Sequence, residues 1–239
     1  MITLRAAPAA LPSGQRIYAI GDVHGCTDRL CAMHRAIAAD MAERPVGDAL
    51  LIHMGDYIDR GPDAATAIAT LLGGLVVPGV RVINLMGNHE DLMLSALAEG
   101  ADPEAAGLWL DNGGAASLRS WGVAPAAGPL AWRAHIPAEH VAFMRNLSLT
   151  HRAGGYLFVH AGVRPGIALD AQSAHDMLWI REPFLSFTGD LGAVIVHGHT
   201  PVRDPVVRAN RIGIDTGAVM GGRLTCTMLE ADRLGFLSA

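Results

Sequence analysis

The chain has no lysine, few cysteines and no long apolar run. All 18 cationic residues among its 239 are arginine, which excludes a P-loop lysine, a Schiff base and a lysine general base. Any bound phosphate must therefore meet arginine, metal or backbone N–H groups. The three cysteines, Cys26, Cys31 and Cys226, are too few for a disulfide framework and fit a reducing cytoplasm, where we expect the protein to work.

Other absences narrow the possible partners. The sequence shows neither a membrane-spanning stretch nor a signal peptide, so we expect no membrane partner. The net charge of −5 argues against a general nucleic-acid surface. The length suits one substantial domain, and no linker or repeat divides it. We therefore expect a single domain over residues 1–239, with the Ala- and Pro-rich residues 1–13 poorly ordered. The sequence leaves the oligomeric state open.

Five short polar blocks each follow an apolar run that is typical of a buried strand. The runs cover residues 17–20, 49–54, 80–86, 156–159 and 193–196. The blocks are GDVHG at 21–25, GDYIDRG at 55–61, GNHE at 87–90, a lone histidine at 160 and HGH at 197–199. In open α/β sheets, ligands collect beyond the carboxyl ends of the strands. The ligand-type residues of the blocks can therefore converge; they are Asp22, His24, Asp56, Asn88, His160 and His199.

This residue set indicates a metal site. Carboxylate oxygen and imidazole nitrogen together suit Mn, Fe or Zn. A carboxylate shared among six ligands suits two ions rather than one. We therefore predict two bound divalent ions, with Mn preferred and Fe or Zn as alternatives.

Helical patterns separate the strands of the first half, as in a layered α/β fold. We predict helices from a cap at Asp28 to about Met41, from Pro62 to Leu72, and over residues 91–98. Helical pieces broken by Asn-Gly-Gly and Gly-Pro turns fill residues 102–147, which we interpret as an inserted cap. The second half is rich in strands, predicted at 149–152, 156–159, 193–196, 206–208, 212–216 and 223–229.

The five blocks, in this order, resemble those of the metallophosphoesterase superfamily, and more closely those of its bacterial phosphoprotein phosphatase family. They span residues 21–200, most of the chain. The resemblance implies the calcineurin-like α/β fold, in which two mixed β-sheets pack as a sandwich with helices on both outer faces. The helical cap is then an insertion into this fold.

The resemblance also implies a role for each ligand. Asp56 would bridge the two ions, and a hydroxide between the ions would attack the phosphorus directly. The other ligands would be Asp22 and His24 for the first ion, and Asn88, His160 and His199 for the second.

Four further residues take roles by the same resemblance. His89 would protonate the leaving alkoxide, and Asp59 would orient His89. Arg60 and Arg181 would bind the phosphoryl oxygens. The choice of Arg181 depends on the short match LWIRE at 178–182, and Arg164 is the alternative.

Several other conspicuous residues have simpler explanations. We interpret His53 as a core histidine, and Trp109 as a core residue rather than a substrate contact. Glu90 is expected to form local hydrogen bonds or to cap a helix. His197 is expected to support the neighbouring ligand residue.

The leading function is hydrolysis of phosphate monoesters, above all phosphoserine and phosphothreonine in proteins. The partner would be a phosphoprotein or a small phosphorylated substrate. The first alternative is a symmetrical diadenosine tetraphosphate hydrolase, a related group that tends to show GNHD in the third block and to lack the DRG of the second. Glu90 and DRG at 59–61 favour the phosphatase. An alternative of another class is a non-catalytic metal-binding scaffold, against which His89, Asp59 and Arg60 argue.

Overall fold

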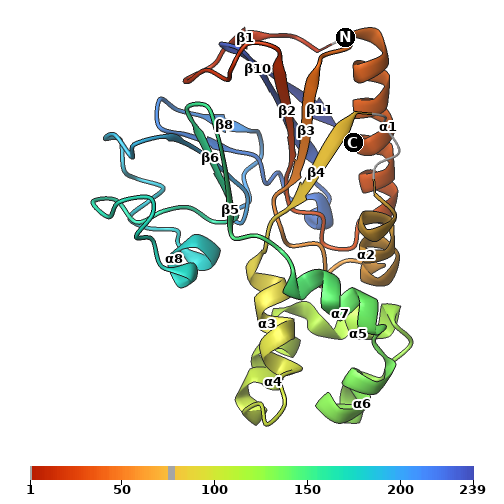
Figure 1. The fold of residues 1–239 in the computed structure, drawn as a ribbon. Coiled ribbons are helices and arrows are strands. Elements are labelled where there is room, and N and C mark those ends of the chain that lie inside the picture. Colours follow the sequence, from red (N-terminus) through yellow and green to blue (C-terminus); the bar gives the residue numbers. More distant parts are fainter. Residues whose placement is uncertain (1, 75–78) are drawn as a thin grey trace.

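Two mixed β-sheets pack face to face in the computed structural model, which describes residues 2–74 and 79–239 (Figure 1). The first sheet has the strand order β1-β11-β10-β2-β3-β4, and the second has the order β5-β6-β7-β9-β8. The first sheet contains β1 (Arg5–Ala6), β2 (Gln15–Ile20), β3 (Asp48–His53), β4 (Val80–Asn84), β10 (Thr225–Glu230) and β11 (Arg233–Ser238). The second contains β5 (Thr150–Ala153), β6 (Tyr156–Val159), β7 (Val194–His197), β8 (Val206–Val207) and β9 (Arg211–Gly213).

The central strands of both sheets run parallel. β2, β3 and β4 pair in parallel, as do β6, β7 and β9. The remaining pairings are antiparallel. Parallel neighbours end at the same edge of a sheet, so the segments that follow them gather at one end of the sandwich.

Alternating side chains build three apolar layers. In β2, Ile17 and Ala19 belong to the core between the two sheets, whereas Tyr18 faces the helices outside the first sheet. In β6, Phe158 joins the core between the sheets, and Leu157 packs on the outer side of the second sheet. The outer helices are α1 (Thr27–Glu43) and α2 (Ala64–Gly73) on the first sheet and α8 (Ala174–Trp179) on the second. The predicted sandwich with helices on both outer faces is confirmed.

Five helices gather at the end of the sandwich where the parallel strands finish (Figure 1). They are α3 (Asn88–Ala96), α4 (Pro103–Trp109), α5 (Ala115–Ser120), α6 (Gly128–His135) and α7 (Ala138–Arg145). A π-helical turn (Leu110–Gly114) joins α4 to α5, and 3-10 turns lie at Pro125–Ala127 and Ala218–Met220. Trp109 and Trp132 pack edge to face with ring centroids 5.5 Å apart, and they give this helical region an apolar core.

The N-terminal segment differs from the prediction. Residues 2–13 were expected to be poorly ordered, but β1 pairs with β11 and Leu11 is buried. Ala7 also donates its N–H to the carbonyl oxygen of Asp232 at 2.8 Å. The prediction was wrong for these residues because the strand that pairs with them, β11, was itself absent from the predicted strands. Met1 lies outside the described residues.

Two helix starts also differ from the prediction. Cys26, not Asp28, occupies the N-cap position of α1, and Asp28 lies in its first turn. α3 begins at Asn88 rather than at residue 91, which places this ligand-type side chain on the first residue of a helix. Among the described residues, no helix combines the length and apolar character needed to cross a bilayer.

Candidate metal centre

The polar blocks meet beneath the helical cap. The six ligand-type residues are at most 6% exposed. The backbone around them takes left-handed conformations, with φ between 44° and 70°, at His24, Asp56, Asp59, Arg60 and His199. Such a φ costs a non-glycine residue on the order of 1 kcal/mol. Among the described non-glycine residues, Ala231 alone shares this conformation away from the site. The fold therefore concentrates its backbone strain where it holds these side chains.

Two compact groups of ligand atoms share Asp56. His24, Asp56 and His89 form one group, and Asp56, His160 and His199 form the other. Within each group the ligand atoms lie within 4.8 Å of one another. Oδ2 of Asp56 is 3.5 Å from Nε2 of His24 and 3.9 Å from Nε2 of His89, whereas Oδ1 is 3.3 Å from Nε2 of His160. One carboxylate thus presents one oxygen to each group, as a bridging ligand does.

Backbone carbonyl groups orient two of the imidazole rings. Nδ1 of His24 donates to the carbonyl oxygen of Ile58, and Nδ1 of His160 donates to that of Met54, each at 2.8 Å. With Nδ1 protonated, a neutral ring leaves Nε2 free to bind a metal ion. Both Nε2 atoms face Asp56. The two rings are therefore held in the tautomer and orientation of metal ligands.

Asn88 and Asp22 lie beside the second group. Oδ1 of Asn88 is 2.8 Å from Nδ1 of His199 and 3.0 Å from Nε2 of His160. The carboxylate of Asp22 accepts the backbone N–H of His199 at 3.0 and 3.2 Å. Asp22 lies outside the two compact groups, and His89, expected as an acid, lies inside the first. The structure brings all six predicted ligands and His89 to one site.

The donor set fits divalent metal ions. Nε2 of His89 and Nε2 of His199 are buried without a hydrogen-bond partner among the described residues. Buried polar atoms normally have a partner, and a metal ion or a substrate atom at the site would supply one. Imidazole nitrogen with carboxylate and amide oxygen suits Mn, Fe or Zn.

A buried histidine–aspartate pair adjoins the first group. Nδ1 of His89 donates to Oδ2 of Asp59 at 2.8 Å. Burial lowers the pKa of His89, but the carboxylates of Asp56 and Asp59 outweigh it and raise this pKa above its ordinary value. Asp59 also accepts Nε1–H of Trp109 at 3.0 Å and the hydroxyl of Ser117 at 2.6 Å. Helices α4 and α5 thus fix Asp59, and Asp59 fixes the ring of His89.

Glu90 organises the loop that carries the shared carboxylate. The fully buried side chain accepts four backbone N–H groups, those of Asp56, Tyr57, Ile58 and Gly87, at 2.8–3.3 Å. The expected helix cap is present, because Gly87 is the N-cap residue of α3, and the other three bonds reach across to the second block. Glu90 therefore positions Asp56 without facing the ligand groups.

Comparison with known proteins assigns the family. The family model described as calcineurin-like phosphoesterase matches residues 15–229. This chain belongs to that family. It is therefore a phosphoesterase hydrolase of a kind that uses divalent metal ions, and the two ligand groups are its candidate metal-binding residues.

Relatives of this phosphoesterase differ in the substrates for which they are named. Serine/threonine-protein phosphatase 1 of Salmonella typhimurium is 31% identical over 232 residues, covering 90% of this chain and 93% of its own. An asymmetrical bis(5'-nucleosyl)-tetraphosphatase of Anoxybacillus flavithermus is 25% identical over 228 residues, covering 86% and 87%. A solved structure named provisionally as a diadenosine tetraphosphatase has a TM-score of 0.66 at 21% identity, covering 98% and 99%. The last likeness shows the fold alone.

Two exposed arginines of the phosphoesterase border its metal centre. Nη1 of Arg60 is 3.1 Å from Nε2 of His24. That nitrogen cannot accept this bond and bind a metal ion at once, so metal binding requires the guanidinium to release it. Arg181 lies near His199, whose pKa is lowered to about 3 by burial, with the positive charge of Arg181 among the further causes. Arg60 thus lies beside the first ligand group, and the role of both arginines in phosphate binding stays a prediction.

Arg164, the alternative to Arg181, is already paired. Its guanidinium forms an ion pair and two hydrogen bonds with the carboxylate of Asp176. Recruiting Arg164 to a substrate would break this pair. The structure therefore favours Arg181 over Arg164 as the second phosphate-binding arginine.

Sequence reasoning missed two polar residues at the site. Ser117 belongs to no sequence motif. Its hydrogen bond to Asp59 forms only when the cap folds over the second block, so the sequence gives no sign of it. Asp215 is 6% exposed, and, after burial, its carboxylate is the largest cause of the raised pKa of Asp22. Asp215 lies within the predicted strand 212–216, just after β9. A carboxylate at a strand end is the same signal that identified the other blocks, so it could have been found.

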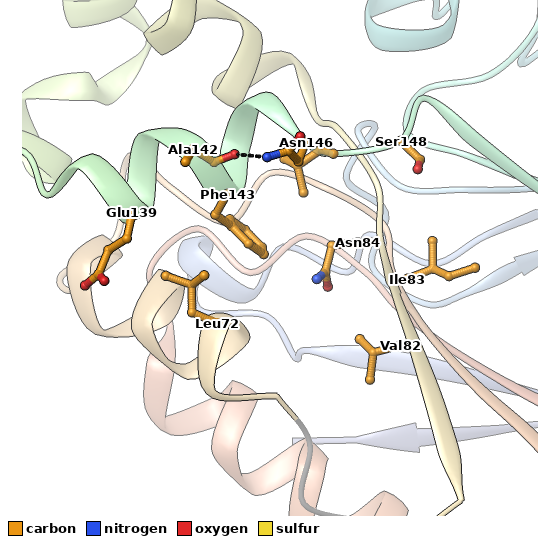
Figure 2. Close-up of a pocket in the computed structure, with 10 residues that line it drawn as sticks. Leu72, Val82, Ile83, Asn84, Glu139, Ala142, Phe143, Asn146 and Ser148 are labelled. Atoms are coloured by element: carbon orange, nitrogen blue, oxygen red, sulfur yellow. Dashed lines mark hydrogen bonds between the residues drawn. The ribbon is translucent and has the colours of Figure 1, made fainter.

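A separate hollow of about 610 Å³ lies between α2, β4 and α7 (Figure 2). Leu72, Val82 and Phe143 line it with apolar surface, and Asn84 forms part of its floor. None of the six ligand-type residues lines this hollow. It is therefore not part of the candidate metal centre.

Proposed function

We propose that this phosphoesterase hydrolyses phosphate monoesters of serine and threonine side chains in proteins, with two divalent ions, preferably Mn, at the ligand groups that share Asp56. The observation that carries the proposal is this shared carboxylate next to the buried His89–Asp59 pair. Serine and threonine alkoxides are poor leaving groups that need a proton. A nucleotide leaving group departs through a phosphate oxygen, which needs that proton less than an alkoxide does. The His89–Asp59 pair therefore favours alkyl phosphate monoesters as substrates.

Each residue around the site has one task in this reaction. The two ligand groups that share Asp56 would hold the ions, which would supply Lewis-acid chemistry by lowering the pKa of water and neutralising phosphoryl charge. Arg60 and Arg181 hold the phosphoryl oxygens through N–H bonds. Nε2 of His89 carries the proton that passes to the leaving oxygen. Asp59 accepts Nδ1–H of His89, which keeps the ring oriented and favours its protonated form.

The size of the rate enhancement requires this division of tasks. Enzymes accelerate phosphate-monoester hydrolysis by up to ~10²¹-fold, whereas general acid–base assistance supplies ~10²–10⁴-fold. His89 alone therefore accounts for a small part. Stabilisation of the transferring phosphoryl group by metal ions and arginine must supply most of the effect.

A dinucleoside tetraphosphatase is the second candidate. The Anoxybacillus relative is named for that activity, and its similarity to this protein extends over most of both chains. The sequence pointed to symmetrical cleavage for this alternative. The Anoxybacillus relative is named for asymmetrical cleavage, and a relative of Acidovorax sp., 31% identical over 75% of this chain and 51% of its own, is named for symmetrical cleavage. Symmetrical cleavage of diadenosine tetraphosphate gives two molecules of ADP, and asymmetrical cleavage gives ATP and AMP. An assay that separates these products decides between the modes.

A substrate panel tests the proposal. The Mn-loaded protein is assayed on phosphoserine, phosphothreonine and phosphotyrosine peptides, diadenosine tetraphosphate and a phosphodiester, with His89→Asn as the control for contaminating activity. We expect the highest kcat/KM on phosphoserine and phosphothreonine peptides. A tenfold or greater preference for the tetraphosphate would contradict the proposal. Absence of turnover on every substrate, with metal bound, would favour the non-catalytic scaffold.

A further inference from the structure

A hollow of about 420 Å³ borders the metal centre on the side of the cap. Its lining consists of Arg60, Gly61, Pro62, Ala116, Arg119 and Ser120. The first three belong to the second polar block and the residue after it, and the last three belong to α5. A volume of this size is typical of small-ligand sites. The hollow is distinct from the one in Figure 2, which these residues do not line.

The position of α5 against the second block is fixed by two serines. The hydroxyl of Ser117 accepts the backbone N–H of Asp59 at 2.7 Å and donates to its carboxylate. The hydroxyl of Ser120 accepts the backbone N–H of Ala65, in the first turn of α2, at 3.0 Å. Residues three apart on a helix share a face, so Ala116 and Arg119 lie together along the hollow. The helix that orients the His89–Asp59 pair thus also sets the place of Arg119.

The charge of the lining is opposite to that of the whole protein. Two guanidinium groups and no carboxylate line the hollow, whereas the chain carries a net charge of −5. Arg119 is exposed, and across residues 2–74 and 79–239 its guanidinium has no ion-pair or hydrogen-bond partner. Five other arginines of the described residues, among them Arg16 and Arg164, are paired with carboxylates. Arg119 is therefore available to an anion from outside the protein.

Arg60 connects the hollow to the reacting centre. Its side chain lines the hollow, and its Nη1 lies 3.1 Å from Nε2 of His24. Its backbone N–H donates to the carbonyl oxygen of Gly113, in the π-helical turn before α5, at 3.3 Å. A φ of 64° further restricts the direction in which the side chain leaves the chain. A group bound in the hollow would therefore sit next to a phosphoryl group held by the same arginine.

We propose that the hollow between Arg60 and Arg119 is a subsite for a second anionic group of the substrate, namely the carboxylate of an aspartate or glutamate that flanks the phosphorylated residue. The proposal rests on the proposed phosphoprotein phosphatase function. A guanidinium binds carboxylate through two parallel N–H bonds, which makes Arg119 a specificity residue and not a catalytic one. The enzyme then prefers phosphorylated sites with acidic neighbours.

The test compares matched phosphoserine peptides. Each pair differs by Glu or Gln at one position, scanned over three residues on either side of the phosphoserine, and kcat/KM is measured for each. We expect the wild-type protein to prefer the Glu peptide by about 3- to 10-fold at one or more positions, chiefly through KM, since the contact is exposed to solvent. In Arg119→Gln the ratio should fall to about 1. Arg145→Gln, which removes the same charge from an exposed position on α7 outside the hollow, should keep the ratio.

The outcomes separate this proposal from the proposed function. A wild-type protein without a Glu preference, or a preference that survives Arg119→Gln, would overturn the subsite while leaving the phosphatase intact. If no phosphopeptide is hydrolysed and diadenosine tetraphosphate is, the proposed function fails. In that case kcat/KM for the tetraphosphate is compared with kcat/KM for an aryl phosphate. A fall in this ratio in Arg119→Gln would assign the hollow to a second phosphate and overturn the carboxylate assignment. An unchanged ratio would overturn the subsite altogether.

Discussion

Two groups of buried histidines in this protein differ in what surrounds them. His89 and His160 face the carboxylate of Asp56 at the metal centre. His34 and His53, between α1 and β3, face each other with Nε2 atoms 2.9 Å apart, and Nδ1 of His53 donates to Oδ1 of Asn84 at 2.7 Å. Asn84 forms part of the floor of the hollow in Figure 2. Burial is similar in the two groups, so the neighbours account for the difference.

The pKa values follow this difference. Burial lowers the pKa of His160, but the carboxylate of Asp56 outweighs it and raises the pKa to about 10. Burial lowers the pKa of His34 to about 4, and burial with the charge of His34 lowers that of His53 to about 3. The comparison shows that a carboxylate partner can outweigh burial and raise the pKa of a buried histidine, as it does at His89 and His160. Burial still lowers the pKa of His24 to about 4 and that of His199 to about 3 at the same site. The pair at His34 and His53 is a neutral part of the core.

The largest expected effect is on catalytic activity, and it distinguishes the two groups of histidines. Asp56→Asn removes the charge that both ligand groups share, so we expect kcat/KM to fall by at least ~10³-fold and the metal content per chain to drop. His34→Gln, in the other group, should keep kcat/KM within about threefold. Steady-state kinetics with elemental analysis measures both. Comparable losses in the two variants would mean that the groups do not differ in function.

The next effect concerns the proton that His89 carries. His89→Asn should lower kcat/KM for a phosphoserine peptide by ~10²–10⁴-fold, and much less for an aryl phosphate whose leaving group needs no proton. Asp59→Asn should act in the same direction more weakly, because His89 remains but loses its orienting partner. Equal losses on both substrates, at unchanged metal content, would point to a role in positioning instead.

A smaller effect is expected at the arginines. Arg181→Lys keeps the charge but loses the planar fork, so it should cost nearly as much as Arg181→Ala, about 10- to 100-fold in kcat/KM. Metal content should stay the same in both variants, because Arg181 is not a ligand. Full activity in Arg181→Ala, with a loss in Arg60→Ala, would show that the second phosphate-binding arginine lies elsewhere.

The smallest expected effect concerns the neutral pair of His34 and His53, and it is measured as the pH dependence of the unfolding free energy. Between pH 7 and pH 5, an unfolded histidine with a pKa near ~6.5 takes up a proton that folded His34, with a pKa of about 4, does not. The stabilisation is therefore present above pH 6.5 and is lost on acidification, by about 2 kcal/mol for one such histidine at pH 5. In His34→Gln the fall in unfolding free energy from pH 7 to pH 5 should be smaller by about that amount. Urea unfolding of the wild-type protein and the variant, each in chelator, measures the unfolding free energy at both pH values. An identical fall from pH 7 to pH 5 in the two proteins would contradict the pKa assignment.

The sequence predicted the part of the site that lies at strand ends. Asp22 and Asp56 follow apolar runs that pair in parallel in the first sheet, and His160 follows a run that is paired in parallel in the second sheet, so each sheet brings its strand ends to one edge. The alternation of apolar runs and helical patterns likewise predicted a layered α/β fold, and these features are encoded locally, within a strand and the residues after it. The packing of two sheets as a sandwich was implied by the family resemblance, not by this alternation.

The missed features depend on contacts between distant segments. Trp109 and Ser117 reach Asp59 because the cap folds over the second block, and no local pattern marks them. β1 is ordered by pairing with β11, at the other end of the chain. Arg119 is placed by the contacts of Ser117 and Ser120, on the same helix. Long-range packing fixes all of these residues, and a single sequence carries no periodic signal for it.

Metal titration tests the central claim most directly, namely that the two groups sharing Asp56 hold two catalytic ions. The protein is stripped with a chelator and titrated with Mn²⁺, while bound metal and phosphopeptide hydrolysis are measured on the same samples. We expect activity to be lost on chelation, to return with metal, and to reach its plateau at two equivalents per chain. Full activity after exhaustive chelation, or a plateau at one equivalent, would contradict the claim.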